Sequence, residues 1–174
     1  MRILIGVASR HGATSEIAER LASQLADAGH HTTVLDVTHD PHDADATDGY
    51  DAFVIGSAIY EGRWIRGARS FVRRHAIELQ RAPVWLFSSG PLGDDEDVGV
   101  AADTIDELVH AVDAIEHRLF TGKLDRQLLG RMERWIVDIV HAHEGDYRDW
   151  AAIDAWAAAI GAQLDRPAGD EDDR

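Results

Sequence analysis

A loop rich in glycine and hydroxyl residues follows the first apolar run of the chain and has the composition of a phosphate-binding loop. The run "RILIGVA" ends at Ala8, and Ser9, Gly12 and Thr14 follow within six residues. Glycine lets the backbone approach an anion closely, and hydroxyls and the N–H groups of a helix N-terminus are good donors to phosphate oxygens. The segment therefore predicts an anion-binding site at the start of a helix.

Several classes of phosphate ligand can be excluded, because this loop lacks the residues that bind them. A nucleoside triphosphate loop needs a lysine after its last glycine, but Ala13 follows Gly12. The dinucleotide fingerprint G-x-G-x-x-G is absent, because Gly6 lies inside the apolar run. A phosphatase loop would need a cysteine, which the chain lacks, and a phospho-receiver would need acidic residues where the strands end in "VAS" and "GSA". A single terminal phosphate, such as the monoester of FMN, fits what remains.

Short apolar runs alternate with segments of helical periodicity along the chain, which predicts an α/β fold with a parallel sheet covered by helices on both faces. The predicted strands are 2–8, 31–37, 51–58, 83–89 and, with a run interrupted by charged residues, 114–122. The predicted helices are 14–28, 65–79, 101–113, 125–141 and 149–164.

Three loops of this fold are expected to form the ligand site. In open α/β sheets, ligands bind beyond the carboxyl ends of the strands, near the point where the strand order reverses. The loops that follow the first, third and fourth predicted strands read "SRHGATS", "SAIYEGRW" and "SSGPLGDDED".

In this order and spacing, the segments "SRHGATSEIA", "YDAFVIGSAIYEGRW" and "FSSGPLGD" resemble the three FMN-contacting loops of the flavodoxin superfamily. Within it, residues 1–164 are most similar to the flavodoxin-type, menaquinone-dependent protoporphyrinogen oxidases and related flavodoxin-domain proteins. The resemblance implies a flavodoxin-like three-layer sandwich, a five-stranded parallel sheet of order 2-1-3-4-5, and FMN as cofactor.

The resemblance also implies which residues contact FMN. The phosphate would be surrounded by Ser9, Arg10, His11, Gly12, Ala13 and Thr14. The edge of the isoalloxazine would be lined by Ser57, Ala58, Ile59, Tyr60, Glu61 and Gly62. Backbone contacts to its pyrimidine side would come from Ser89, Gly90, Pro91, Leu92 and Gly93. The third loop lacks the aromatic residue that electron-carrier flavodoxins commonly stack on the flavin, which leaves the ring open to a substrate.

Composition excludes several other functions. A formal net charge of −15 disfavours binding to nucleic acid. The absence of cysteine excludes disulfides and iron–sulfur clusters, and His141 and His143 point in different directions on a helix end, so we expect no metal site.

With no membrane-length apolar run and no signal peptide, the expected location is the cytoplasm. One domain over 1–164 is expected, followed by a disordered acidic tail over 165–174.

The sequence thus favours an FMN-dependent oxidoreductase, similar to protoporphyrinogen oxidase, that passes electrons from a small-molecule substrate to a quinone or another acceptor. No side chain is an obvious catalytic acid or base. Two alternatives remain: an electron carrier that docks redox protein partners through its acidic surface, and an interaction module without a cofactor. The apolar stripe around Trp135 in the predicted helix 125–141 is expected to pack on the sheet rather than to face a membrane or a quinone.

Overall fold

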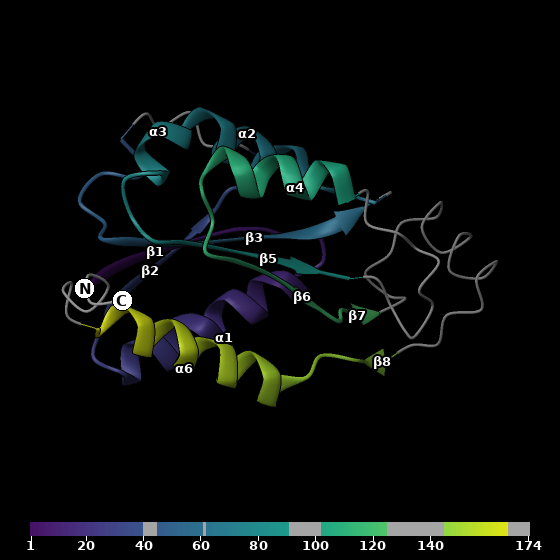
Figure 1. Cartoon of the computed structure of the whole chain (residues 1–174). Helices are drawn as coiled ribbons and strands as arrows, with labels where there is room; N and C mark the ends of the chain where they lie inside the picture. Colours follow the sequence, from purple (N-terminus) through teal and green to yellow (C-terminus); the bar gives the residue numbers. More distant parts are fainter. Residues whose placement is uncertain (40–44, 61, 91–101, 125–144, 167–174) are drawn as a thin grey trace, which may run out of the picture.

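A parallel sheet forms the middle layer of the molecule, and helices cover both of its faces (Figure 1). The computed structural model describes residues 1–39, 45–60, 62–90, 102–124 and 145–166. Five parallel strands lie in the order β2-β1-β3-β5-β6, so the predicted order 2-1-3-4-5 is confirmed. Their bounds are β1 (Arg2–Ala8), β2 (His31–Asp36), β3 (Ala52–Tyr60), β5 (Val84–Ser89) and β6 (Glu116–Phe120).

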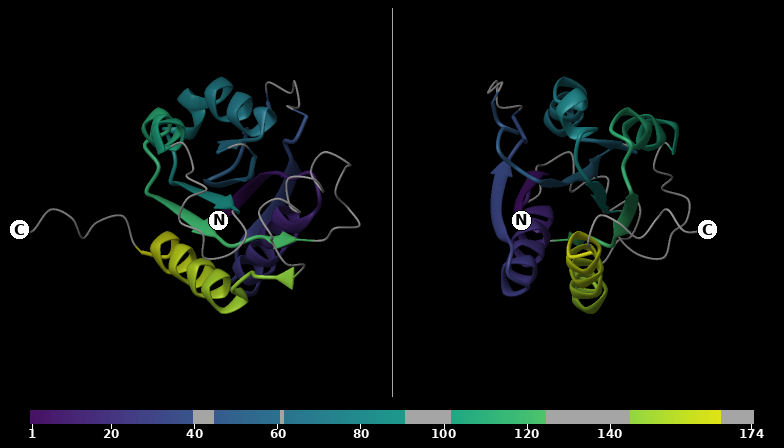
Figure 2. Two further views of the ribbon diagram at one scale, coloured as in Figure 1. Left: turned by 90° about the vertical axis from the view of Figure 1, so that its right-hand side faces the viewer. Right: turned by 60° about the vertical axis from the view of Figure 1, so that its left-hand side comes forward.

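The helices are divided between the two faces of the sheet (Figures 1 and 2). One face carries α1 (Ala13–Asp27) and α6 (Trp150–Leu164). The other carries α2 (Arg66–Arg74), α3 (Ala76–Leu79) and α4 (Ala102–Ala111). A short antiparallel pair, β7 (Lys123–Leu124) and β8 (Gly145–Asp146), precedes α6. The predicted helices 14–28, 101–113 and 149–164 thus correspond to α1, α4 and α6.

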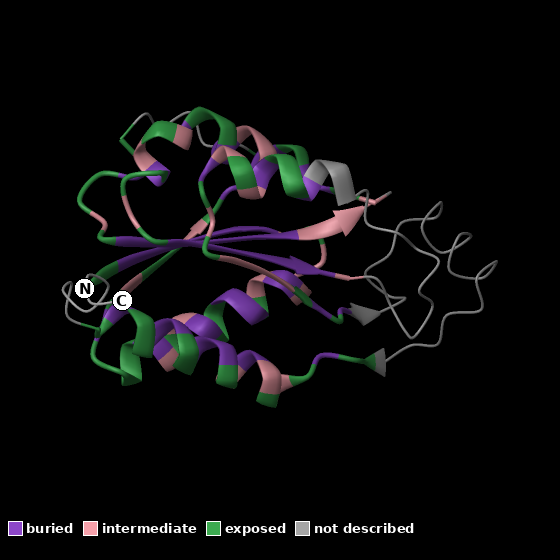
Figure 3. Ribbon diagram, viewed as in Figure 1, coloured by how far each residue is buried: buried purple, intermediate pink, exposed green. Residues whose placement is uncertain are grey.

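The central strands are buried on both faces, whereas the edge strands are partly exposed (Figure 3). Every residue of β5 is buried, and the side chains of β1 alternate between the two hydrophobic clusters of the protein. Strands β2 and β6 lie at the two ends of the strand order, and among the described residues no further strand pairs with their outer sides. This position explains the charged residues that interrupt the apolar run of the last predicted strand.

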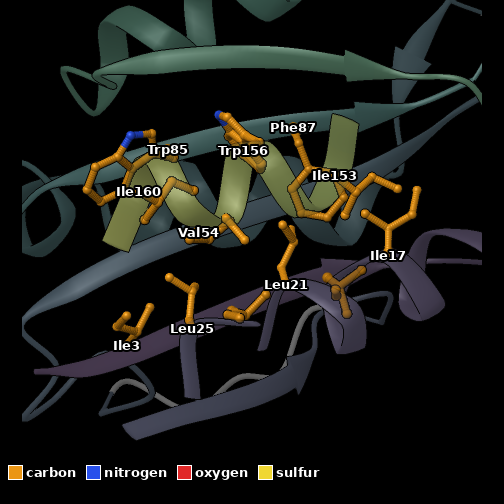
Figure 4. Close-up of a cluster of buried hydrophobic side chains, with 14 of the residues drawn as sticks. Ile3, Ile17, Leu21, Leu25, Val54, Trp85, Phe87, Ile153, Trp156 and Ile160 are labelled. Atoms are coloured by element: carbon orange, nitrogen blue, oxygen red, sulfur yellow. The ribbon is translucent and has the colours of Figure 1, made fainter. Parts of the chain in front are cut away.

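The cluster between the sheet and the pair α1/α6 is built around Trp156 (Figure 4). Its ring is fully buried and makes edge contacts with Phe87 and Phe120, at centroid distances of 6.0 and 5.5 Å. The indole N–H donates to Glu116 Oε2 at 2.8 Å. From α1, the apolar positions that predicted a helix, Ile17, Leu21 and Leu25, point into the same cluster.

The helix predicted over 65–79 is in fact two helices, because the chain leaves the helical conformation at His75. This residue has φ −100° and ψ 17°, in the bridge region between helix and strand. Its ring is buried and lies 4.6 Å from the ring of Phe71. Packing of this side chain therefore accompanies the break between α2 and α3, which apolar spacing did not reveal.

The third predicted strand is longer than expected and is followed by a strand that was not predicted. Strand β3 continues to Tyr60, and β4 (Arg63–Trp64) pairs with it in antiparallel fashion, with Tyr60 opposite Arg63. Gly62 has φ 71°, a conformation that glycine adopts without strain and that suits a tight hairpin. Strand β4 brings the sheet to six strands within the described residues.

Some predictions fall on residues outside those that the structure describes. These are the helix over 125–141 with Trp135, and residues 167–174 of the predicted tail. In the described part of the chain, no helix has the length and the apolar character needed to span a bilayer.

Candidate functional site

The carboxyl ends of β1, β3 and β5, where the three predicted loops begin, lie side by side at the same end of the sheet (Figure 1). In the parallel register Ala8 lies beside Ser57, and Ala58 lies beside Ser89. The second and third loops touch, because a Cβ atom built on Gly90 would lie 3.8 Å from the Cβ atom of Ile59. The described residues of these loops therefore form one continuous region.

Hydrogen bonds from a neighbouring segment anchor the first loop. The N–H group of Ser9 donates to Thr38 Oγ1 at 3.0 Å, and the Thr38 hydroxyl donates to the Ser9 carbonyl at 3.2 Å. The Ser9 hydroxyl accepts from the N–H group of Gly12 at 3.1 Å. A hydroxyl that accepts in this way keeps its own hydrogen for a further acceptor. Thr38, which the sequence did not single out, thus fixes the start of the loop.

Helix α1 begins without a side-chain cap. Its N-cap residue is Gly12, with φ 84°, and no side chain accepts a hydrogen bond there. The N–H group of Glu16 donates to the carbonyl of Gly12 at 2.9 Å, which begins the helical pattern. The N–H groups of the preceding residues of the first turn, including Ala13 and the buried Thr14, have no acceptor within the helix itself. They form a cluster of donors at the positive end of the helix dipole.

The first and second loops meet at Tyr60. The guanidinium carbon of Arg10 lies 4.5 Å from the centroid of the Tyr60 ring, and the ring of His11 lies 6.2 Å from it. A cation over an aromatic face is attracted by the ring quadrupole. Three of the predicted site residues are thereby brought together, with the side chain of Tyr60 between the two loops.

The side chain of Ser57 shapes the second loop from inside the protein. Its buried hydroxyl donates to the carbonyl of Ala58 at 2.8 Å and accepts from the N–H group of Ile65 at 2.9 Å. Trp64 is also buried and packs in the cluster beneath α2 and α4. These two residues hold the β3–β4 hairpin against the sheet.

The third loop is described only at its beginning. Ser89 is buried, and the N–H group of Gly90 donates to the carbonyl of Phe120 at 3.0 Å. Gly90 has φ 113°, which favours glycine. The other predicted site residues, Glu61, Pro91, Leu92 and Gly93, lie outside the described residues.

A buried polar network that the sequence did not reveal connects the second loop to β5 and β6. Trp64 Nε1 donates to Ser88 Oγ at 2.7 Å, and Ser88 Oγ lies 2.8 Å from His117 Nε2. Because an indole N–H can only donate, the Ser88 hydroxyl accepts from Trp64, and its hydrogen is best used toward a neutral His117 ring. Burial lowers the pKa of His117, against the opposing effect of the negative charges of Asp106 and Glu116.

The lowered pKa of His117 predicts a pH-dependent contribution of this network to stability. His117 binds a proton less readily in the folded than in the unfolded protein, so its contribution is fully present above the unfolded pKa of about 6.5 and is lost as the pH falls below it. Urea unfolding of wild type and His117→Gln at pH 7.5 and pH 5.5 measures this contribution. We expect the stability advantage of wild type to shrink at pH 5.5, by at most about 1.4 kcal/mol per pH unit. An advantage that stays constant or grows would contradict this assignment.

Arg148, which the sequence analysis also did not single out, contacts the first loop from the segment before α6. Its side chain is 2% exposed, and its NH1 group donates to the carbonyl of Ala13 at 3.2 Å and to Glu16 Oε2 at 2.6 Å. The contact with Ala13 spans 135 positions, so no local spacing could reveal it. The predicted helix 149–164 begins at Asp149, which caps α6 by accepting a hydrogen bond from the N–H group of Ala152. Arg148, the residue before Asp149, belongs to no recognisable sequence motif.

A family model described as "Flavodoxin domain" matches residues 4–150. Over 90 residues, the chain is 34% identical to the protoporphyrinogen IX dehydrogenase [quinone] of Escherichia coli strain K12. This stretch covers 51% of the chain and 48% of that protein, so the chain spans about half the length of the curated relative. The match to a flavodoxin family and to an oxidoreductase supports a redox function of the flavodoxin type.

Solved flavodoxin structures share the fold. Oxidised flavodoxin 2 from Bacillus cereus is 19% identical, with a TM-score of 0.61 over 94% of this chain and 99% of that chain. Oxidised flavodoxin 1 from the same organism is 18% identical, with a TM-score of 0.56 over 81% and 98%. Since the family model covers most of the sequence, the chain belongs to the flavodoxin-domain family, whose members bind FMN.

Proposed function

We propose that this protein is an FMN-dependent oxidoreductase whose cofactor site is formed by the three loops at the carboxyl ends of β1, β3 and β5. The observation that carries the proposal is the uncapped start of α1, with Gly12 in the left-handed conformation beside the second loop. The predicted residues from Ser9 to Thr14, from Ser57 to Gly62 and from Ser89 to Gly93 are its proposed contacts.

The described residues fit the phosphate end of FMN. Apart from its chain neighbours, no atom of the described residues lies within 4 Å of a Cβ atom built on Gly12, so these residues leave the space beside the helix start open. The N–H groups of the first turn supply donors without acceptors in the helix, and the Ser9 hydroxyl adds another. Arg10 adds a positive charge at the same loop. A donor set of this kind suits the oxygen atoms of a phosphate monoester.

The described residues of the second and third loops fit the ring end. The isoalloxazine carries N–H and carbonyl groups along one edge and a broad apolar face, which call for backbone polar groups and apolar side chains. Ile59 and Tyr60 supply partly buried apolar surface, and Gly62 and Gly90 keep the backbone accessible. FMN supplies the redox chemistry when it is bound, while the protein binds and orients it and controls the access of water.

We infer that the electron donor is a small-molecule substrate of the porphyrinogen type and that the acceptor is a quinone. This inference is supported by the 34% identity with protoporphyrinogen IX dehydrogenase. An electron carrier is the second candidate, favoured by the likeness to flavodoxins over 98% and 99% of their chains. A carrier would exchange electrons with a protein partner and would convert no substrate of its own.

A reconstitution and turnover experiment distinguishes these functions. The purified protein is loaded with FMN, freed of excess flavin and mixed with protoporphyrinogen IX and a soluble menaquinone analogue. The expected result is a yellow protein that forms porphyrin and quinol faster than free FMN at the same concentration. A yellow protein without turnover would support the carrier, and a protein that retains no flavin would overturn the proposed function.

A further inference from the structure

Arg148 joins the segment before α6 to the first turn of α1 by a set of charged contacts in which the arginine is buried and its two carboxylate partners are partly exposed. Its guanidinium is paired with Asp146, whose carboxylate oxygens accept from Nε and NH2 at 2.7 and 2.6 Å. The guanidinium also lies 4.4 Å from the centroid of a Trp150 ring. With these contacts and those to Ala13 and Glu16, the side chain has little freedom to move. The hydrogen bonds to Asp146 outweigh burial and raise the pKa of Arg148, so it stays charged.

The position of Glu16 gives this arrangement a consequence for anion binding. Glu16 lies in the first turn of α1, and its N–H group bonds to the carbonyl of Gly12 in the first loop. A free carboxylate there would stabilise the helix dipole but would repel a second anion at the same helix end. Arg148 pairs with this carboxylate at 2.6 Å and at the same time holds the carbonyl of Ala13. It therefore offsets the charge of Glu16 and fixes the turn that carries the donors.

We propose that Arg148 is a positioning residue that makes the first loop selective for a phosphorylated flavin over the unphosphorylated one. It acts through Glu16 and Ala13, without a contact to the ligand. This inference rests on the proposed function, because it assigns the phosphate of FMN to this loop. It adds the source of the selectivity, which lies 135 positions away from the loop.

The test compares FMN and riboflavin binding to three variants. Arg148→Met keeps an unbranched, flexible side chain but removes its charge and its hydrogen-bond donors, and we expect FMN to bind about tenfold more weakly while riboflavin binding changes less than about twofold. Adding Glu16→Gln to Arg148→Met removes the carboxylate in the first turn of α1, while Asp146 remains in both variants, and is expected to restore most of the FMN affinity. Glu16→Gln alone changes a 46% exposed side chain and is expected to strengthen FMN binding two- to threefold.

Arg20 provides a matched control. It forms a bidentate salt bridge from α1 to Asp154 of α6, at 2.6 and 2.7 Å, so Arg20→Met removes the same charge and another link between α1 and the C-terminal segment. We expect its FMN affinity to stay within about twofold of wild type, because exposed ion pairs contribute little.

The folded state is checked by hydrogen exchange of the apoproteins. In Arg148→Met the exchange of backbone amides should increase at the first turn of α1 and stay unchanged at its last turn.

Equal losses of FMN and riboflavin affinity, or no recovery on adding Glu16→Gln, would show a merely structural role and overturn the inference. If Arg148→Met does not fold, the test rests on the FMN affinity of the Glu16→Gln variant alone. Unchanged or weaker FMN binding by Glu16→Gln, compared with wild type, would then overturn the inference. A wild type that binds no FMN would instead overturn the proposed function, and this inference with it.

Discussion

Gly12→Val is expected to weaken FMN binding by at least about a hundredfold while the protein stays folded. A β-branched residue at φ 84° is strained by about 1–2 kcal/mol or more, so the loop would leave this conformation and turn its N–H groups away from the helix end. A valine that kept the conformation would place its methyl groups in the open space above α1. Titration of the apoprotein with FMN, followed by the quenching of flavin fluorescence, measures the loss.

Gly29 is a matched control for this variant. It has φ 94° and follows the opposite end of α1, and apart from its chain neighbours no atom of the described residues lies within 4 Å of a Cβ atom built on it. Gly29→Val therefore introduces similar backbone strain far from the three loops, and we expect its FMN affinity to equal that of wild type. Similar FMN affinities for the two variants would mean that the Gly12 loop does not bind the cofactor.

Trp156→Ala is expected to lower the free energy of unfolding by about 3–5 kcal/mol, the usual range for deleting a large buried aromatic side chain. The ring is fully buried between Phe87 and Phe120, and its removal would leave a cavity between α6 and the sheet. Urea unfolding followed by circular dichroism at pH 7.5 measures the change.

Trp156→Phe separates packing from hydrogen bonding at this site. It keeps an aromatic ring but loses the donor to Glu116 Oε2, so we expect a loss of about 1–2 kcal/mol. An alanine variant as stable as the phenylalanine variant would show that the cluster around Trp156 contributes little. Neither variant is expected to change the FMN affinity of the molecules that remain folded.

The sequence predicted the elements that have one dominant physical cause. β1, β3 and β5 are continuous apolar runs because both of their faces are buried, and α1 has a clear stripe because one face packs on the sheet. The break at His75 and the hairpin of β4 were missed. At His75 the apolar spacing continues past the break, whereas the segment of β4 has the composition of a loop. In both places the observed structure depends on side chains such as Phe71 and Trp64 packing against other elements.

The same distinction holds for the site. The place where its three proposed loops begin could be predicted, because parallel strands all end at the same end of a sheet. Arg148 and His117 could not, because each acts through a contact that depends on the finished fold: Arg148 with Ala13, and His117 with Ser88. Charged and polar side chains in such contacts follow no period along the chain.

The two edge strands have a consequence for how these molecules meet at high concentration. An edge strand presents unpaired backbone N–H and carbonyl groups that can add the strand of another molecule. In β6, Glu116 and Arg118 form an ion pair at 2.6 Å, and both side chains are at least one third exposed. In β2, His31 and Asp36 are exposed. Pairing of a second chain along either edge would desolvate these groups, which disfavours strand-to-strand aggregation although Val34 and Leu119 are exposed on the same two strands.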